Sequence, residues 1–238
     1  MYIRSGSADV RVLRNIFSRG DYRIPGELIG GVSNIIDLGA YIGVSTAYFA
    51  QRYPRARVLA VEPDPDNYAC LVRNAANLDA DRVRIVRSCI SNKKGMVRFD
   101  TSGLGWARHI VEDGGIVVPC LTIADLLEQH EIDRADILKM DIEGAERFAF
   151  EIADQWLNRV RWIMMEVHFA SLSLSELVAM VSRHGRQVFF KASSPYPHWA
   201  EVVGSSHSQV DSRIAMLDVV IPPAGEASRL RSVQPYDP

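Results

Sequence analysis

In NIIDLGAYIG, residues 34–43, a short apolar run ends at a turn containing two glycines. Residues 44–51 are compatible with a helix, so the stretch predicts a buried strand that turns directly into a helix. Glycines at such a turn let the backbone bend sharply and let a ligand approach the main chain. We therefore expect a sheet that binds a ligand at the ends of its strands.

Apolar runs of the same kind recur along the chain, and they are nearly continuous in Val, Ile and Leu rather than alternating. Helix-compatible segments separate the first of them, which is the pattern of a parallel sheet wound by helices. Continuous apolar runs are typical of strands covered on both faces. We expect an α/β fold with a mostly parallel, seven-stranded sheet and helices on both faces. The six further strands are RVLAVEP (57–63), RVRIVRS (82–88), DILKMDI (136–142), RWIMMEVH (161–168), a strand near 186–192 and RIAMLDVVI (213–221).

The chain of 238 residues is long enough for one well-buried core and short for two. We expect an N-terminal helical extension at 1–30, in which Asp9 caps a helix over residues 9–17. A single domain follows at 31–222, with an insertion at about 94–120. The remaining residues, 223–238, are polar and contain proline, which indicates a flexible tail.

The insertion interrupts the strand–helix alternation. KGMVRFD (94–100) and GIVVPCLTI (115–123) predict a β-hairpin around a polar, glycine-rich segment. That segment, 101–114, contains Trp106 and His109. Because long loops of this kind are commonly functional, we expect it to fold over a ligand as a lid.

Composition argues against several classes of partner. Lys and Arg total 27 against 29 Asp and Glu, so the chain lacks the basic excess of a nucleic-acid-binding protein. Cys70, Cys89 and Cys120 form no C-x-x-C pair, which favours reduced thiols in a cytoplasmic protein. A signal peptide and an apolar run long enough to span a membrane are both lacking, so no membrane partner is expected. The oligomeric state stays open, with a homodimer as one option.

Glu62 ends the second strand 19 residues after Gly43, where an acid can accept hydrogen bonds from ribose hydroxyls. This spacing predicts a cofactor that carries a nucleoside, although the glycines alone could simply make a tight turn. A dinucleotide needs glycine where this chain has Tyr41, so that a pyrophosphate can lie against the backbone. S-adenosylmethionine has no phosphate, and Asp37 is placed to meet its positive charges. Tyr41 and Asp37 therefore favour S-adenosylmethionine over NAD.

A second polar motif, KMDIEGAE (139–146), closes the fourth strand. Because successive side chains of a strand point to opposite faces, Lys139, Asp141 and Glu143 are expected on one side of this strand. A buried lysine needs a partner, and Asp141 or Glu166 is the natural one. For Glu146, the simpler interpretation is favourable negative charge at a helix N-terminus.

Taken in order, these segments resemble the FkbM-type family of methyltransferases. The resemblance spans about residues 33–168, and the order of the pieces is specific although each piece is common. It implies a single Rossmann-like class I methyltransferase domain, S-adenosylmethionine as cofactor, and O-methylation of a small molecule, a sugar, or a glycan or natural-product intermediate. The matching segments are IIDLGAYIGVSTAYFA (35–50), VLAVEPDPDNYACLVRNAAN (58–77), DILKMDIEGAE (136–146) and MMEVH (164–168).

The resemblance also implies roles for individual residues. Ser88 and Cys89, after the third strand, are expected beside the adenine. The other expected cofactor residues are Asp37, Gly39, Ala40, Gly43, Glu62 and Pro63. The expected catalytic residues are Lys139, Asp141, Glu166 and His168, with Glu143 on the same side.

A hydroxyl is a poor nucleophile and benefits from a general base. His168 is the first candidate, because the unperturbed pKa of histidine is about 6.5, and Asp141 is the second. A less favoured alternative is Mg²⁺ held by Asp141 with Glu166 or His168, and we assign no metal ligand. Two alternative functions also remain, namely an NAD-dependent oxidoreductase and a non-catalytic protein that binds a nucleoside.

Overall fold

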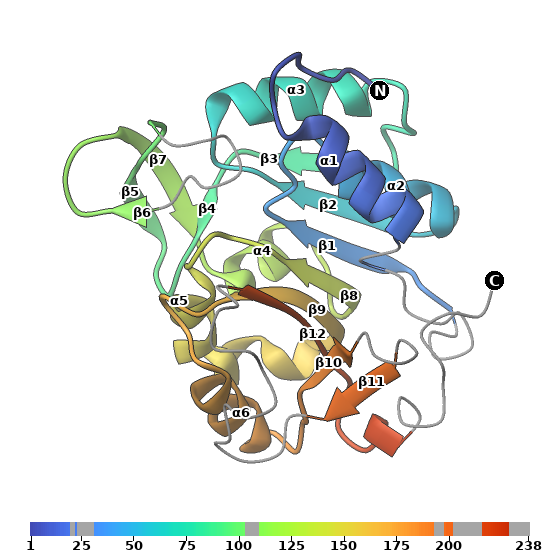
Figure 1. The fold of residues 1–238 in the computed structure, drawn as a ribbon, viewed down its shortest axis with the longest axis vertical. Helices are drawn as coiled ribbons and strands as arrows, with labels where there is room; N and C mark the ends of the chain where they lie inside the picture. The colour runs from blue at the N-terminus through green and yellow to red at the C-terminus, as the bar shows by residue number, and fades with distance from the viewer. Residues whose placement is uncertain (20–21, 23–30, 103–109, 193–197, 202–215, 229–238) are drawn as a thin grey trace.

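The computed structural model describes the chain except for residues 20–21, 23–30, 103–109, 193–197, 202–215 and 229–238. A large sheet forms the centre of the molecule (Figure 1). In this sheet the order of strands is β11-β10-β12-β9-β8-β1-β2-β3. The strands are β1 (Asn34–Leu38), β2 (Arg57–Val61), β3 (Val83–Val86), β8 (Ala135–Met140), β9 (Val160–His168), β10 (Phe189–Ala192), β11 (His198–Glu201) and β12 (Met216–Ile221).

Five neighbouring strands pair in parallel, in the order β9-β8-β1-β2-β3. Beyond β9, the strands β12, β10 and β11 add an antiparallel edge. This arrangement confirms the predicted α/β fold. The sheet has one strand more than the seven expected, because β11 pairs with β10 beyond a segment, 193–197, that lies outside the described residues. Four of the five residues of β1 and of β2 are buried, as their continuous apolar sequences predict.

Helices cover both faces of the sheet, as expected. One face packs against α4, α5 and α6 through the largest apolar cluster, and α2 packs on the other face. Thr122 caps α4, since it forms a capping box with Asp125 at the start of the helix. The helices are α2 (Val44–Arg52), α3 (Pro65–Ala75), α4 (Ile123–Gln129), α5 (Glu146–Glu151) and α6 (Leu174–Ser182), with 3₁₀ turns at Ala153–Gln155 and Leu157–Arg159.

A second, smaller sheet contains the predicted hairpin. Its strands are β4 (Cys89–Ile90), β5 (Gly95–Phe99), β6 (Ile110–Val111) and β7 (Ile116–Leu121), in the order β4-β7-β5-β6. β5 and β7 pair antiparallel from Gly95 opposite Cys120 to Phe99 opposite Ile116. Trp106, Arg108 and His109, in the predicted lid, lie outside the described residues, so the lid stays a prediction.

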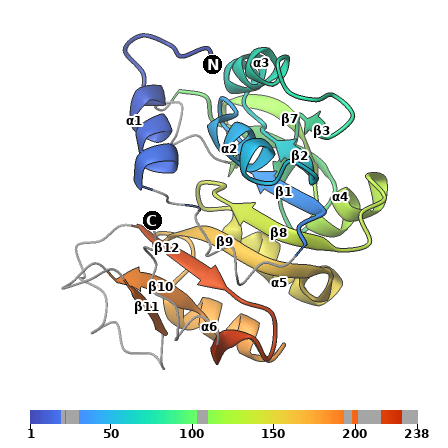
Figure 2. The ribbon, with the colours of Figure 1, turned by 90° about the vertical axis from the view of Figure 1, so that its right-hand side faces the viewer.

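The N-terminal segment forms α1 (Asp9–Arg14) and a π-helical turn (Asn15–Arg19), which lie beside α2 (Figure 2). The predicted cap is wrong, because Ala8 occupies the N-cap position and Asp9 is the first helical residue. Asp9 is fully buried, and its carboxylate binds Arg4 and Tyr41 instead.

Cys70, Cys89 and Cys120 are all free thiols, as predicted. Within the described ranges, every helix is too short or too polar to cross a bilayer.

Candidate active site

A cavity lies at the carboxyl ends of β1, β2 and β8. Its volume is about 830 Å³ when the space at its open mouth is included. Open α/β sheets bind ligands at this end of their strands. Of the predicted residues, Asp37, Gly43, Glu166 and His168 lie outside the cavity lining. The predicted residues that line it are Gly39, Ala40, Glu62, Pro63, Ser88, Cys89, Lys139, Asp141 and Glu143.

Glu62 is the buried carboxylate of this cavity, with 5% of its surface exposed. Its Oε2 accepts a hydrogen bond from the backbone N–H of Tyr41 at 2.8 Å, and its Oε1 accepts one from that of Asp64 at 3.1 Å. The Asn67 side-chain amide donates to Oε1 over a longer 3.4 Å. Burial raises the pKa of Glu62 to about 7, although these hydrogen bonds oppose the shift. A carboxylate has about four acceptor positions, so Glu62 keeps capacity for a ligand hydroxyl.

Asp37 lies beneath the glycine turn and is fully buried. Its Oδ2 accepts hydrogen bonds from the hydroxyls of Ser45 and Thr46, each at 2.7 Å. Its Oδ1 lies 3.5 Å from Lys139 Nζ. Because these groups inside the protein use the carboxylate, the geometry does not support the expected contact of Asp37 with the charged end of a cofactor.

Lys139 stabilises the turn after β1 by donating hydrogen bonds to its main-chain carbonyl groups. Its Nζ donates to the carbonyl oxygen of Gly39 at 2.6 Å and lies 3.8 Å from Asp141 Oδ2. Burial alone would lower its pKa, but Asp37 and Asp141 outweigh burial and raise it. The expected pairing with Asp141 is therefore present, and Asp37 is a second partner. A protonated lysine cannot accept a proton, so this geometry favours a positioning role.

The two glycines of the turn serve the packing of the backbone. Gly39 has φ +74°, and a Cβ there would lie 1.7 Å from the carbonyl oxygen of Asp141. Gly43 has φ +88°, and a Cβ there would lie 2.7 Å from the side chain of Leu71 on α3. Gly39 lines the cavity through its backbone, whereas Gly43 brings two helices together.

Ser88 and Cys89 line the cavity where the two sheets meet. The Ser88 hydroxyl is used within the protein, because it donates to the Cys89 carbonyl oxygen at 2.8 Å. Phe99 and Ile110, from the smaller sheet, add apolar lining that no sequence motif indicates. This wall is suited to a flat apolar ring such as a nucleobase.

His168 lies between two carboxylates at the end of β9. Its Nδ1 is 3.0 Å from Glu146 Oε1, and its Nε2 is 3.2 Å from Glu143 Oε2. Glu146, at the start of α5, is fully buried and also accepts a hydrogen bond from the backbone N–H of Ile142. The sequence pattern at Glu146 indicates only a favourable charge at a helix N-terminus. Its pairing with His168 depends on β9 and α5 lying side by side.

The two glutamates change the protonation of His168. Burial by itself would lower the pKa, but the pairs with Glu143 and Glu146 raise it to about 11. At neutral pH the ring is therefore an imidazolium, which has no lone pair to accept a proton. This state argues against the predicted general-base role. Glu166, on the same strand, is half-buried and lies away from the cavity lining.

Asp141 and Glu143 are the carboxylates that reach the cavity on this side. Burial raises the pKa of Glu143, and His168 opposes that shift. Asp141, Glu143 and His168 each offer one atom that could bind a metal, and these atoms lie within 4.8 Å of one another. The sequence suggested Asp141 with Glu166 or His168 as metal ligands, whereas this group contains Asp141, His168 and Glu143.

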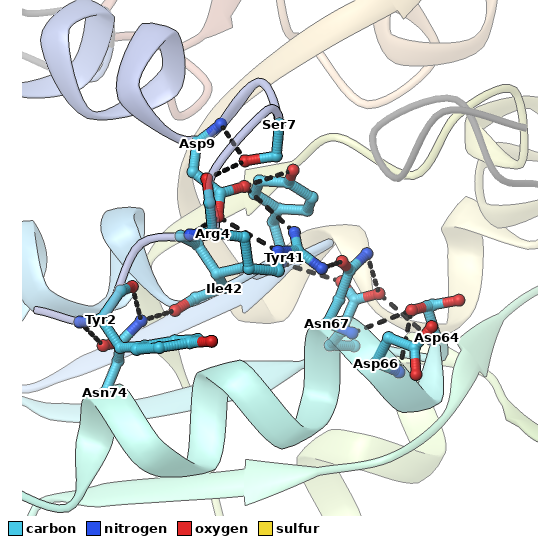
Figure 3. A network of polar contacts seen from close by, with 11 residues as sticks. Tyr2, Arg4, Ser7, Asp9, Tyr41, Ile42, Asp64, Asp66, Asn67 and Asn74 are labelled. Atoms are coloured by element: carbon cyan, nitrogen blue, oxygen red, sulfur yellow. Dashed lines mark hydrogen bonds and ion pairs between the residues drawn. The ribbon is translucent and has the colours of Figure 1, made fainter.

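The N-terminal segment supplies lining that no sequence motif indicated. Val12 and Ile16, from α1 and the turn that follows it, line the cavity together with Tyr22. Arg4 and Asp9 point toward Tyr41, next to the glycine turn (Figure 3).

The cavity fits the expected cofactor, S-adenosylmethionine, at three points. Glu62 has acceptor capacity for a ribose hydroxyl, the Gly39 turn exposes main chain, and Phe99 belongs to an apolar wall beside Ser88. Tyr41 stands where a dinucleotide would need glycine, and it lines the cavity as well.

Comparisons with known proteins identify relatives. A sequence model of the methyltransferase FkbM domain matches residues 37–188. The 2-O-methyltransferase NoeI of Sinorhizobium fredii is 28% identical over 152 residues, which cover 56% of this chain and 62% of NoeI. The hexuronic acid methyltransferase AglP of Haloferax volcanii is 23% identical over 134 residues, 56% of this chain and 54% of AglP. The 31-O-demethyl-FK506 methyltransferase FkbM of Streptomyces tacrolimicus is 25% identical over 221 residues, 77% of this chain and 84% of that protein.

Among solved structures, the plantazolicin methyltransferase BpumL in complex with SAH aligns with a TM-score of 0.47 and 12% identity, covering 90% of this chain and 84% of BpumL. The chain spans less than two thirds of the length of NoeI and of AglP. The matched segment, residues 37–188, covers more than half of the chain and contains the glycine turn, Glu62 and the acidic motif at 139–146. The chain belongs to the FkbM methyltransferase domain family.

Proposed function

We propose that this protein is an S-adenosylmethionine-dependent O-methyltransferase that acts on a hydroxyl of a small molecule or sugar. The observation that carries the proposal is that one cavity is lined by Glu62 and by the pair Asp141 and Glu143. Glu62 is suited to the ribose of the cofactor. The other two carboxylates are suited to an acceptor that carries hydroxyl groups.

The relatives support this substrate class. NoeI is named as a 2-O-methyltransferase, AglP as a hexuronic acid methyltransferase, and the Streptomyces tacrolimicus protein as a 31-O-demethyl-FK506 methyltransferase. A glycan or natural-product intermediate in the cytoplasm fits the same chemistry. Neither the NAD-dependent oxidoreductase nor the non-catalytic binding protein gains support from these relatives.

S-adenosylmethionine, when bound, supplies a methyl group that is already activated by the sulfonium. The residues of the chain then need to hold the acceptor oxygen in line and remove its proton. Glu143 is the best-placed base, because it lines the cavity and burial raises its pKa toward the working pH. His168 pairs with Glu143 and is itself positioned by its pair with Glu146. Asp141 is placed to orient the hydroxyl.

Calorimetry with S-adenosylhomocysteine, followed by turnover with labelled methyl donor and a panel of sugars and polyketides, tests the proposal. Glu143→Gln should lower turnover by roughly 10²–10⁴-fold with little change in S-adenosylhomocysteine affinity. Glu128→Gln, on the exposed side of α4, is the matched control and should behave like the wild type. A folded wild-type protein that binds no S-adenosylhomocysteine would overturn the function, whereas full turnover of Glu143→Gln would overturn only the choice of base.

A divalent ion at Asp141, Glu143 and His168 is the alternative means of activating the hydroxyl. We expect turnover to survive EDTA, because an imidazolium between two glutamates has no lone pair for a metal. Loss of turnover in EDTA, with recovery on addition of Mg²⁺ or Mn²⁺, would establish the metal route instead.

A further inference from the structure

Residues 2–16 precede the family match, which begins at residue 37, yet they reach the cofactor cavity. Val12 and Ile16 line the cavity, and Ile16 packs in one apolar cluster with Ile42 and Val44 at the start of α2. The beginning of the segment is also held, because the Asn74 side chain makes hydrogen bonds to both backbone groups of Tyr2.

The first connection from this segment to Glu62 passes through Tyr41. Asp9 is fully buried, and its Oδ1 accepts a hydrogen bond from the Tyr41 hydroxyl at 2.6 Å. The backbone N–H of the same tyrosine donates to Glu62 Oε2 at 2.8 Å. Tyr41 has φ 53°, a conformation that is unfavourable for a bulky residue and needs support from its surroundings. Asp9 supplies support at the far end of the side chain.

The second connection passes through Arg4. Its Nη2 lies 3.0 Å from Asp9 Oδ1, and its Nε donates to Asp9 Oδ2 at 3.1 Å. Its Nη1 donates to Asn67 Oδ1 at 2.9 Å, and the Asn67 amide nitrogen lies 3.4 Å from Glu62 Oε1. Asp9, Tyr41, Glu62, Asn67 and Arg4 thus form a closed ring of polar contacts. Figure 3 shows Arg4 and Asp9 turned toward Tyr41 and Asn67.

A buried ion pair is weak evidence for stability, because removing both charges from water offsets most of their attraction. The ring built on the pair of Arg4 and Asp9 has a clearer consequence for position. The ring contacts both oxygens of Glu62, one through Tyr41 and the other through Asn67, and so restricts rotation of that carboxylate. Preorganisation of this kind strengthens ligand binding without adding a direct contact.

We propose that residues 2–16 are part of the cofactor site, and that Arg4 and Asp9 are positioning residues that orient Glu62 toward the ribose. This inference rests on the proposed function, because it takes Glu62 as the ribose ligand. It assigns a role in cofactor affinity to residues that do not touch the reacting atoms.

Tyr41→Phe is the most selective test, because it removes the hydrogen bond to Asp9 and keeps the ring and the backbone. We expect Tyr41→Phe and Asp9→Asn each to weaken S-adenosylhomocysteine binding about tenfold by calorimetry. KM for S-adenosylmethionine should rise in parallel, with kcat unchanged at saturation. The control is Tyr53→Phe, which removes a hydroxyl at the end of α2, outside the cavity lining.

A double-mutant cycle with Glu62→Gln separates positioning from a general loss of structure. If Asp9 acts through Glu62, then Asp9→Asn should change the affinity of the Glu62→Gln protein by less than about twofold. Fully additive losses, or unchanged affinity in a folded Tyr41→Phe protein, would overturn the inference and leave the proposed function intact. A wild-type protein that binds no S-adenosylhomocysteine would instead overturn the function itself.

Discussion

At the scale of single residues, the fold acts mainly on the protonation of carboxylates and of one imidazole. Glu62 has a pKa raised to about 7 by burial, although main-chain donors reach both of its oxygens. His168 has a pKa raised to about 11 because two glutamates outweigh its burial. Both groups therefore have a pKa above their ordinary value, and the histidine keeps the higher one.

Cofactor affinity should depend on pH near neutrality. The ionised form of Glu62 accepts hydrogen bonds from hydroxyls more strongly, and it is lost as the pH falls through about 7. Calorimetry should show S-adenosylhomocysteine affinity falling by roughly tenfold between about pH 8 and about pH 6. Glu62→Gln should bind more weakly at every pH and lose this dependence. A wild-type affinity that stays constant over the range would contradict the role of Glu62.

His168 and His184 provide a matched comparison for stability. In each, Nε2 lies 3.2 Å from a carboxylate, but the His184 partner Asp154 is 91% exposed whereas the second partner of His168, Glu146, is fully buried. His168→Ala leaves two glutamates without their cation and should lower the free energy of unfolding by about 3 kcal/mol. His184→Ala should cost less than about 1 kcal/mol. Equal losses in the free energy of unfolding, measured in urea, would contradict a larger contribution from the buried pair.

At the scale of elements, the turns after β1 and after β8 interlock. Gly39 leaves room for the carbonyl of Asp141, whose backbone N–H in turn donates to the Leu38 carbonyl. Glu143 and Gly144, in the second turn, both have positive φ, which directs the Glu143 side chain back toward β9. The two turns together place both acidic groups on the cavity.

Gly39→Ala and Gly144→Ala should therefore differ sharply. Both positions have positive φ, so alanine costs about 1–2 kcal/mol at either. A Cβ at Gly144 meets nothing closer than 3.5 Å, whereas one at Gly39 would overlap the Asp141 backbone. We expect Gly39→Ala to lose about 4 kcal/mol or more in thermal unfolding, or to fail to fold. Similar, small losses for both variants would contradict the interlocked turns.

At the scale of the whole molecule, the site is assembled from segments far apart in the chain. The parallel strands bring the ends of β1, β2 and β8 to one edge, and the smaller sheet and the N-terminal segment complete the cavity. A ligand that bridges so many segments binds only the folded state. Such a ligand should stabilise the entire domain rather than one loop.

Thermal unfolding should report this linkage. S-adenosylhomocysteine at about 100 times its Kd should contribute about 2.7 kcal/mol. For a chain of 238 residues that corresponds to a rise in Tm of roughly 5–10 °C. NAD at the same concentration should leave Tm unchanged. A larger rise with NAD would favour the oxidoreductase alternative.

Local patterns in the sequence predict the parallel strands of the sheet and the turns that carry the site. Continuous apolar runs report burial on both faces, and glycines report turns, because both signals depend only on neighbours along the chain. Glu62, Lys139 and Asp141 were identified because each follows or ends such a run. Their lining of one cavity follows from the parallel sheet, in which the ends of neighbouring strands meet.

The partners of each polar group become clear only when the folded chain is seen. Asp37 pairs with Lys139 within the protein, and the pairs with Glu143 and Glu146 raise the pKa of His168, which argues against its expected role as a base. Asp9, expected as a helix cap, instead contacts Tyr41 from outside the matched family segment. The physical reason is that protonation and hydrogen bonding depend on groups brought together across the fold, whose distances no local pattern encodes.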